Sequence, residues 1–405
     1  MNKEERVITF GCRLNACESE TICEFAAELG LETYTIINSC AVTAEAERKL
    51  QQTIRSLFES DENIKIILTG CASELHPEFY LKMNGVVGII SNKMKLSRTA
   101  YEKYAAGQLP LAKDAVSKTY KNRIRGFLQI QNGCDHKCTY CVVRLARGPS
   151  VSFSPEDIVA RAKNMLAKGY REIVLTGVNI SSYSGGLGGL IRFLLKQIPQ
   201  LKRLRLSSLD PADMNDELLK IFAGEERLMP HLHESIQSGD NLLLRRMLRR
   251  HTAEQVVEIN EKILALRPDV VLGADLITGF PTETDEMFEN TKKLLQNAHV
   301  SLAHVFPFSP RPATPAYAMP QVPRRVCLSR ALELRTLAKA LGRQKMLEFI
   351  GKTSPALAES EFFAKTNSFL QIKSREKLVP GEAYLFDCED CEKTYIIGRP
   401  VKVNG

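Results

Sequence analysis

The sequence lacks the hydrophobic segments that membrane insertion or secretion would need. No run of about 18 apolar residues occurs in the chain, and the opening residues, MNKEERVITF, contain no apolar core of signal-peptide length. A disorder-type composition is also absent, because 44% of the residues are hydrophobic and 25% are charged. For these 405 residues we expect two or three folded domains in the cytoplasm, with no membrane partner.

Three of the eleven cysteines lie in one short stretch, GCDHKCTYC, at Cys134, Cys138 and Cys141. In a reducing compartment, cysteines are more often metal ligands, reactive thiols or buried apolar residues than disulfides. This spacing lets three thiolates converge on one iron–sulfur cluster and leaves one iron open for a substrate. A structural zinc site would need a fourth ligand, and His136, between the first two cysteines, is poorly placed to complete a tetrahedron. The C-x3-C-x2-C spacing resembles the signature of the radical S-adenosylmethionine (SAM) enzymes.

The segment 6–106 alternates short apolar runs with amphipathic stretches. This pattern predicts a small parallel β-sheet domain with helices between its strands. The expected strands are 7–10, 35–38 and 64–69, and the expected helices are 18–29 and 44–59.

A cysteine follows each of these three strands, at Cys12, Cys40 and Cys71. Loops after the carboxyl ends of neighbouring parallel strands gather in one crevice, so these three cysteines are expected to meet around a second cluster. The alternative is that they are small buried apolar residues. Cys17 and Cys23 lie off this pattern, and we interpret them as structural.

The middle of the chain repeats a strand-then-helix pattern six times, which predicts a partial barrel because a full eight-fold barrel would need more chain. The strand candidates are 126–131, 172–176, 203–207, 232–237, 270–277 and 301–306. Glycine and polar residues follow several of them, at 176–179, 207–211, 237–240 and 279–284. Catalytic residues of such folds lie on these loops, so we expect a binding site at this rim.

The last part of the chain, from about residue 348, contains short alternating segments separated by turn residues, which predicts a small β-barrel. It also holds a lone C-x2-C pair, Cys388 and Cys391, for which zinc binding is the minor interpretation because no second pair lies nearby. Residues 107–122 are polar and basic and are expected to form a linker.

Four motifs together resemble the radical SAM methylthiotransferases. They are TFGCRLN at 9–15, NSCAVT at 38–43, LTGCA at 68–72 and the Cys134 loop. The GCRLN wording, with Glu18 and Glu20 after it, most resembles the members that act on N6-threonylcarbamoyladenosine. The resemblance covers essentially the whole chain.

The resemblance implies an α/β fold in three domains. The first, 1–106, is an amino-terminal parallel-sheet α/β methylthiotransferase domain carrying the auxiliary cluster. After the linker at 107–122 comes a central partial (β/α)6 radical SAM barrel at 123–345, and then a small TRAM-like, RNA-binding β-barrel at 346–405.

The resemblance also implies two [4Fe-4S] clusters, one on Cys12, Cys40 and Cys71 and a catalytic one on Cys134, Cys138 and Cys141. SAM is expected to lie against Tyr140, Gly177, Asn179, Ser207 and Gln237. In this assignment the Tyr140 backbone lies near the adenine, the Gly177 backbone approaches the methionine groups, and Ser207 and Gln237 offer hydrogen bonds. Taken singly, such residues are equally typical of turns and helix caps.

The expected function is conversion of N6-threonylcarbamoyladenosine at tRNA position 37 to its 2-methylthio derivative, by SAM radical chemistry and sulfur insertion. The implied partners are the tRNA anticodon stem-loop, an electron donor such as a flavodoxin or ferredoxin, and a sulfur source. A net charge of +8 is compatible with an anionic partner. One departure from common family wording is Glu234, where an apolar residue is usual, so local packing or substrate shape is expected to differ there.

Two other kinds of function remain open at this point. Other members of the family modify isopentenyladenosine in tRNA or an aspartate of a ribosomal protein. A non-enzymatic alternative is an iron–sulfur electron carrier or an RNA-binding scaffold. Electron carriers complete their cluster with four cysteines, so the sets of three argue against that alternative.

Overall fold

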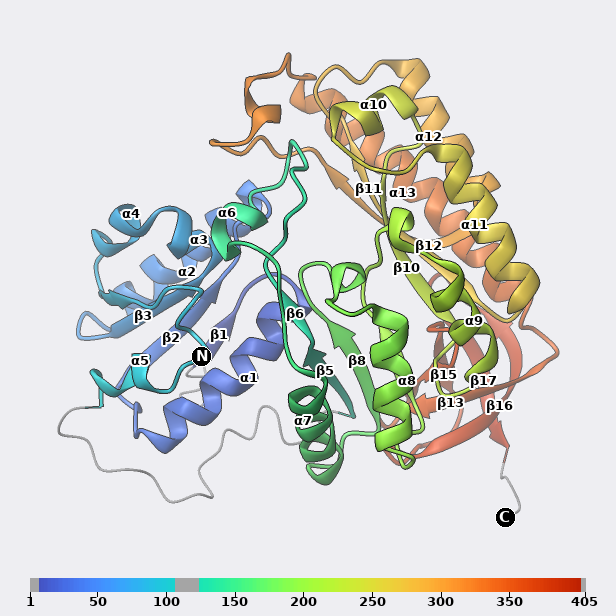
Figure 1. The fold of residues 1–405 in the computed structure, drawn as a ribbon, viewed down its shortest axis with the longest axis horizontal. Helices are drawn as coiled ribbons and strands as arrows, with labels where there is room; N and C mark the ends of the chain where they lie inside the picture. The colour runs from blue at the N-terminus through green and yellow to red at the C-terminus, as the bar shows by residue number, and fades with distance from the viewer. Residues whose placement is uncertain (1–6, 106–123, 402–405) are drawn as a thin grey trace.

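The computed structural model describes residues 7–105 and 124–401. The linker expected at 107–122 lies outside the described residues. Figure 1 shows three parts in chain order: a sheet domain in blue, a central set of strands and helices in green to orange, and a barrel in red. The expected α/β fold with a terminal β-barrel is therefore confirmed.

The first part is a four-stranded parallel sheet in the order β1-β2-β3-β4. Its strands are β1 (Val7–Thr9), β2 (Tyr34–Ser39), β3 (Lys65–Gly70) and β4 (Val86–Ile89). The fourth strand was not expected, because its VVGI stretch is short and carries no cysteine after it. In the register of the sheet, Thr9 lies opposite Asn38 and Asn38 opposite Thr69, so the three strands that precede cysteines end at the same edge.

The helices of this part are α1 (Arg13–Glu28), α2 (Ala44–Ser60), α3 (Cys71–Leu75), α4 (Pro77–Leu81) and α5 (Thr99–Glu102). Helix α1 begins directly after Cys12, five residues earlier than the sequence pattern predicted. The start gives no capping signal, because the Cys12 side chain makes no hydrogen bond to the first turn. Helix α2, by contrast, has Thr43 as a capping residue that accepts from the Ala46 N–H.

The central part contains two three-stranded parallel sheets, β5-β8-β9 and β10-β11-β12. A single parallel bridge between Leu209 and Glu234 continues one sheet into the other. The six strands are β5 (Arg125–Gln129), β8 (Glu172–Thr176), β9 (Leu204–Leu206), β10 (His231–Gln237), β11 (Val271–Thr278) and β12 (Val300–Pro307). The six-strand partial barrel predicted from the sequence is confirmed.

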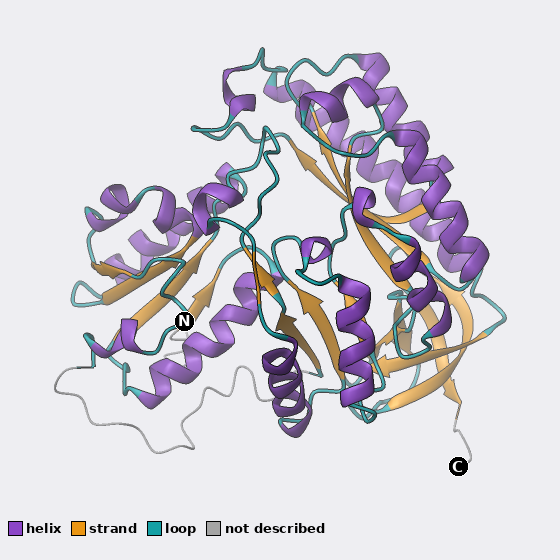
Figure 2. Cartoon of the chain, viewed as in Figure 1, coloured by secondary structure: helices purple, strands orange, loops and turns teal. Residues whose placement is uncertain are grey.

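Helices cover the outer side of these strands, as Figure 2 shows. They are α7 (Pro155–Ala167), α8 (Leu187–Gln197), α9 (Asp216–Gly224), α10 (Asn241–Arg246), α11 (Ala253–Leu266), α12 (Asp285–Asn297) and α13 (Arg324–Leu347). The short α6 (Val143–Arg147) follows the Cys134 loop, and the antiparallel pair β6 (Gln131–Asn132) and β7 (Val151–Ser152) lies at the base of that loop.

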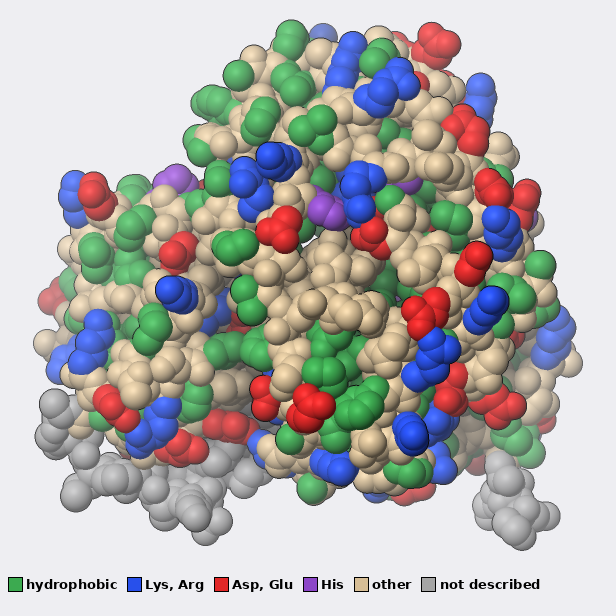
Figure 3. Space-filling view, in the orientation of Figure 1, with side chains coloured by type: hydrophobic (Ala, Val, Ile, Leu, Met, Phe, Trp, Pro, Cys, Tyr) green, Lys and Arg blue, Asp and Glu red, His purple; other side chains and the backbone are tan. Residues whose placement is uncertain are grey.

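No helix within the described ranges is long and apolar enough to span a bilayer. The face shown in Figure 3 carries Lys and Arg side chains next to Asp and Glu side chains, with hydrophobic side chains spread between them.

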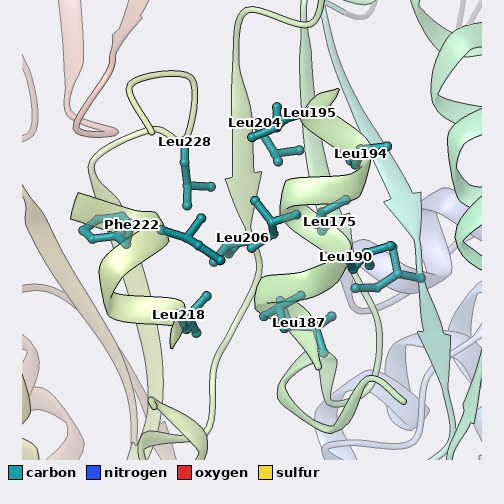
Figure 4. Close-up of a cluster of buried hydrophobic side chains, with 14 of the residues drawn as sticks. Leu175, Leu187, Leu190, Leu194, Leu195, Leu204, Leu206, Leu218, Phe222 and Leu228 are labelled. Carbon is teal, nitrogen blue, oxygen red and sulfur yellow. The ribbon is translucent and has the colours of Figure 1, made fainter. Parts of the chain in front are cut away.

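Aliphatic side chains, most of them leucines, form much of the barrel core. On α8, Leu187, Leu190, Ile191 and Leu194 follow helical spacing, and all four are buried against the strands. Figure 4 shows the leucines of α8 meeting Leu175 of β8, the strand β9 and side chains of α9. Each buried side chain of this size contributes about 1.5–3 kcal/mol. This packing fixes the strands whose carboxyl ends carry the site.

The last part is a closed five-stranded barrel in the order β13-β14-β15-β17-β16. Its strands are β13 (Thr353–Ala358), β14 (Phe363–Thr366), β15 (Gln371–Ser374), β16 (Ala383–Cys391) and β17 (Ile396–Val401). Cys388 and Cys391 both lie on β16 and are buried in the barrel core with Phe386 and Ile396. Their surroundings are those of small apolar residues.

A buried ion cluster joins this barrel to the central part. Glu172 on β8 accepts from Arg125, Arg203 and Arg205, and the Arg205 guanidinium also donates to the Thr366 carbonyl at 2.9 Å. Burial alone would raise the pKa of Glu172, but the three arginines lower it to about 2. The carboxylate is therefore charged and paired where the two parts meet.

Replacing Glu172 with Gln should destabilise the protein by roughly 3–5 kcal/mol, because three guanidinium groups would lose their common carboxylate in a buried position. The measurement is the urea unfolding midpoint under anaerobic conditions. Glu217→Gln is the control, since Glu217 pairs with Arg192 on the surface and should cost about 1 kcal/mol or less. Equal shifts for the two variants would contradict this assignment.

Candidate active site

The loop between β6 and α6 brings Cys134, Cys138 and Cys141 together. Its first turn needs Gly133, which has φ +69°, because a Cβ there would lie 1.8 Å from the Pro149 carbonyl oxygen. The Cys141 N–H donates to the Cys138 carbonyl at 3.1 Å, which curls the loop back on itself. Burial raises the pKa of the Cys141 thiol to about 11, and the nearby thiolates of Cys138 and Cys134 add to this.

The other predicted set meets at the shared edge of the first sheet. Cys40 and Cys71 are buried, whereas Cys12 is exposed. Burial raises the pKa of Cys40 to about 12, with smaller contributions from Cys12 and Cys71. Close approach of the loops depends on Gly11, which has φ +94°, since a Cβ there would lie 2.5 Å from Cys40 Sγ.

Both cysteine sets have the donor chemistry that an iron–sulfur cluster requires. In each set three thiols lie close enough for their charges to interact, and burial disfavours the thiolate forms of Cys40 and Cys141 when no compensating positive charge is near. Iron supplies that charge, and each set offers three ligands. The residues present therefore fit one cluster in each set.

One cavity of about 580 Å³ opens between the first sheet domain and the barrel. Cys12 and Cys141 both line it, so one cysteine of each set faces the same space. Other lining residues from the first domain are Gly11, Arg13, Leu14, Val42 and Thr43. Much of the rest is apolar: Val142 lies between the Cys134 loop and α6, and Ile277, Phe306 and Phe308 lie at or just after the ends of barrel strands.

Four of the five residues expected near SAM line this cavity, namely Tyr140, Gly177, Ser207 and Gln237. Asn179 is not among the lining residues, because Gln131 Oε1 accepts from the Asn179 and Val178 N–H groups, both at 3.0 Å, and fixes this turn against β6. The packing of this turn against β6 also requires a glycine at residue 177. A Cβ at Gly177 would lie 2.8 Å from the Gln131 carbonyl oxygen, so glycine is needed for packing against β6.

An Asp210-centred cluster beside the Cys134 loop was missed by sequence reasoning. The Arg249 guanidinium contacts Asp210 at 3.2 Å and Cys138 Sγ at 3.6 Å, and it donates to the Ser235 carbonyl at 2.8 Å. His136 Nδ1 lies 3.4 Å from Asp210 Oδ2. Burial alone would raise the pKa of Asp210, but His251, Arg249 and the Ala212 N–H together hold it below its usual range. Arg249 thus connects the cysteine loop to the barrel rim.

A second polar cluster that sequence reasoning missed lies on three adjacent strands. His233 Nε2 on β10 and His304 Nδ1 on β12 both approach Asp275 Oδ1 on β11, at 3.0 and 3.3 Å. All three residues line the cavity. The available signal was the spacing of His231 and His233, which places both on the same side of β10.

The unusual Glu234 points the other way along β10. It is fully buried, and its carboxyl lies near Asn260 of α11 on the outer side of the barrel. Burial raises the pKa of Glu234 to about 7. Glu234 does not line the cavity. This departure from the family wording therefore affects local packing and not the shape of the cavity.

Arg147 joins the two cysteine-bearing parts. Its guanidinium contacts the Glu18 carboxylate at 2.7 and 2.9 Å and Asn15 Oδ1 at 2.6 Å. Lys95 Nζ lies 2.6 Å from the same carboxylate, and the side chains of Glu18 and Lys95 are completely buried. Burial alone would raise the pKa of Glu18, but Lys95 and Arg147 lower it. These contacts hold α1 against α6.

Two family models match the chain: the Radical SAM superfamily over residues 128–295, and the uncharacterized protein family UPF0004 over residues 5–91. The threonylcarbamoyladenosine tRNA methylthiotransferase MtaB of Rickettsia prowazekii is 40% identical, covering 98% of this chain and 97% of that protein. The tRNA-2-methylthio-N(6)-dimethylallyladenosine synthase of Erythrobacter litoralis is 34% identical, covering 88% and 86%.

Among solved structures, the radical SAM methyltransferase TsrM from Kitasatospora setae is similar in fold, with a TM-score of 0.53 and 14% identity. The match covers 73% of this chain and 66% of that one.

Replacing Arg147 with Gln should lower the free energy of unfolding by about 3 kcal/mol or more, because Glu18 would lose a buried charge partner. Arg144→Gln is the matched control, since Arg144 lies on the same helix α6 but is exposed, and should cost less than about 1 kcal/mol. Chemical denaturation of both variants measures the difference. A loss in Arg147→Gln no larger than that in Arg144→Gln would rule out the proposed importance of this contact.

Proposed function

This chain belongs to the radical SAM tRNA methylthiotransferase family, and from that membership we propose that it converts N6-threonylcarbamoyladenosine at tRNA position 37 to its 2-methylthio derivative. The observation that carries the proposal is the single cavity lined by Cys12 from one cysteine set and Cys141 from the other. Sulfur transfer and hydrogen removal both need access to one adenine, and this cavity offers it.

The proposal assigns Cys134, Cys138 and Cys141 to the catalytic [4Fe-4S] cluster and Cys12, Cys40 and Cys71 to the auxiliary one. When bound, the clusters and SAM supply radical chemistry and a sulfur site, which an adenine C–H bond requires because it is neither acidic nor activated. The protein's own part is to bind, to orient and to exclude water.

Several cavity residues suit these tasks. Ser207 and Gln237 present polar side chains from the ends of β9 and β10, where SAM is proposed to lie. Tyr140 packs its ring edge-to-face against the buried Phe280, with ring centroids 6.5 Å apart, which holds the backbone between Cys138 and Cys141 in place. Phe306 and Phe308 add apolar surface that limits access of water.

A second cavity, of about 750 Å³, supports tRNA as the substrate. It lies between the barrel and the terminal β-barrel, and no Asp or Glu is found among the described residues that line it. Its basic lining residues are Arg13, Arg335, Lys339, Arg343, Lys365 and Lys393. Clustered cations of this kind suit contacts to RNA phosphates. Arg13, His233, His304 and Phe306 line both cavities, which connects this basic surface to the proposed reaction site.

The two other substrates of the family fit less well. The polar wall formed by Arg13, His233, Asp275 and His304 suits a polar adenosine modification better than an isopentenyl group. The basic lining of the second cavity favours RNA over a protein aspartate. The reaction also requires an electron donor, such as a flavodoxin or ferredoxin, and a sulfur source.

Iron analysis tests the two cysteine assignments. The anaerobically reconstituted protein should hold about eight irons and eight sulfides per chain. A variant with Cys12, Cys40 and Cys71 changed to Ala, or one with Cys134, Cys138 and Cys141 changed to Ala, should hold about four of each. Cys17→Ala is the control, because this thiol donates to the Phe127 carbonyl at 3.0 Å and its loss should leave the iron content unchanged. Eight irons in either triple variant would refute the assignment.

Mass spectrometry of tRNA nucleosides tests the substrate. Cells that lack this protein should lose 2-methylthio-N6-threonylcarbamoyladenosine and accumulate the unthiolated nucleoside. A plasmid encoding the wild type should restore it, and one encoding Cys134→Ala should not. If the 2-methylthio derivative of isopentenyladenosine disappears instead, the substrate assignment is wrong and the alternative holds.

A further inference from the structure

The cavity has one wall built mainly from charged and polar side chains. Arg13, the first residue of α1, lies there beside His233, Asp275 and His304 from the three strands of the second sheet. We propose that Arg13, assisted by His304, binds the carboxylate of the threonylcarbamoyl group and so selects the modified adenosine. This inference rests on the function proposed above and names the residues that recognise its substrate.

Arg13 has no acidic partner among the described residues. It forms no ion pair or side-chain hydrogen bond there, and its guanidinium lies 5.8 Å from the centre of the Phe369 ring. Burial, and then the nearby Arg125, lower the pKa of Arg13, whereas Asp275 raises it without forming an ion pair. A partly buried guanidinium without a carboxylate is compensated when an anion enters the cavity.

Asp275 is not the ion-pair partner of Arg13, because its carboxylate oxygens already have other partners. Its Oδ1 faces both His233 and His304, and Ser208 Oγ donates to its Oδ2 at 3.3 Å. The two imidazole rings are held 4.8 Å apart by this arrangement. His304 meets Asp275 through Nδ1, so Nε2 lies on the opposite side of a ring that is largely exposed to the cavity. Asp275 therefore orients the histidines.

The same three groups are of the types that bind divalent metal ions, and their ligand atoms lie within 4.8 Å of one another. Arg13 argues against a cation at this position, since its own positive charge interacts with Asp275 across the same space. A dication there would be repelled by the guanidinium, whereas an anion would be attracted.

A carboxylate is the anion that the proposed substrate provides. The threonylcarbamoyl group ends in one, whereas unmodified adenosine and isopentenyladenosine have no charge at this position. The planar guanidinium can donate two parallel hydrogen bonds to a carboxylate, which combines strength with a defined orientation. Because Arg13 follows Cys12 directly, a carboxylate held there places the adenine ring near the cysteine that faces the cavity.

Binding of three synthetic anticodon stem-loops to the full-length reconstituted protein tests this proposal. They carry N6-threonylcarbamoyladenosine, its uncharged carboxamide analogue, or unmodified adenosine at position 37. The wild type should bind the carboxylate form more tightly than the carboxamide by on the order of tenfold to a hundredfold, the range of a charged hydrogen bond. Arg13→Gln should bind the carboxylate and carboxamide forms equally, and Arg13→Lys should recover part of the difference.

Arg98→Gln is the control for a general loss of positive charge on the same domain. Arg98 is exposed, pairs with Glu28 and Glu102, and does not line the cavity. It should leave the preference for the carboxylate form intact. If Arg13→Gln retains the full preference, the inference is wrong. If Arg13→Gln does not fold, the wild type decides, because equal binding of the carboxylate and carboxamide forms overturns the proposal.

The outcomes also separate this inference from the proposed function. A wild type that methylthiolates the threonylcarbamoyl substrate but does not distinguish carboxylate from carboxamide disproves only the role of Arg13. A wild type that neither methylthiolates this substrate nor prefers it to unmodified adenosine disproves both.

Discussion

The buried contact between Glu18 and Arg147 determines how the two cysteine sets face each other. Glu18 lies on α1, six residues after Cys12, and Arg147 lies on α6, six residues after Cys141. A buried ion pair of this kind contributes little net stability compared with apolar packing, but breaking it is costly, so it favours one arrangement over others. Asn15 extends the contact, because its amide donates to the Phe10 and Ser39 carbonyls at the ends of β1 and β2.

A second buried ion cluster joins the central partial barrel to the terminal β-barrel. Glu172 and its arginines join β8 to the terminal β-barrel through the backbone of Thr366 and Asn367. Charged clusters at both junctions set the orientation of the parts, while apolar packing stabilises each part internally. Arg13 and His304 line both cavities, so the two spaces adjoin at these residues.

Sequence patterns predicted most of the elements, although not β4, because strand and helix periodicity is local. The three strand-end cysteines of the first domain were expected to meet because the loops after neighbouring parallel strands gather at one edge of the sheet. Pairs of side chains distant in the chain could not be predicted. The partners of Asp210 come from the Cys134 loop and from the segment after α10, and only the folded barrel brings them together. Asn179 is one example. Its loop was predicted to lie at the rim of the site, but the hydrogen bonds to Gln131 that fix this turn could not be predicted. The start of α1 at Arg13 was not predicted because no side-chain cap marks its first turn.

Because Cys12 and Arg13 are adjacent, the proposed sulfur site lies next to the proposed carboxylate site. Cys12 ends the turn between β1 and α1, and Arg13 is the first residue of α1. The position of this turn depends on Gly11 packing against Cys40 and on the Asn15 contacts that lead to Arg147. A change in the junction between the domains would move the proposed sulfur site and the proposed carboxylate site together. In this proposal, substrate selection and sulfur placement both depend on one segment of backbone. A substrate held by its carboxylate at Arg13 would then be positioned relative to the auxiliary cysteines by the same contact.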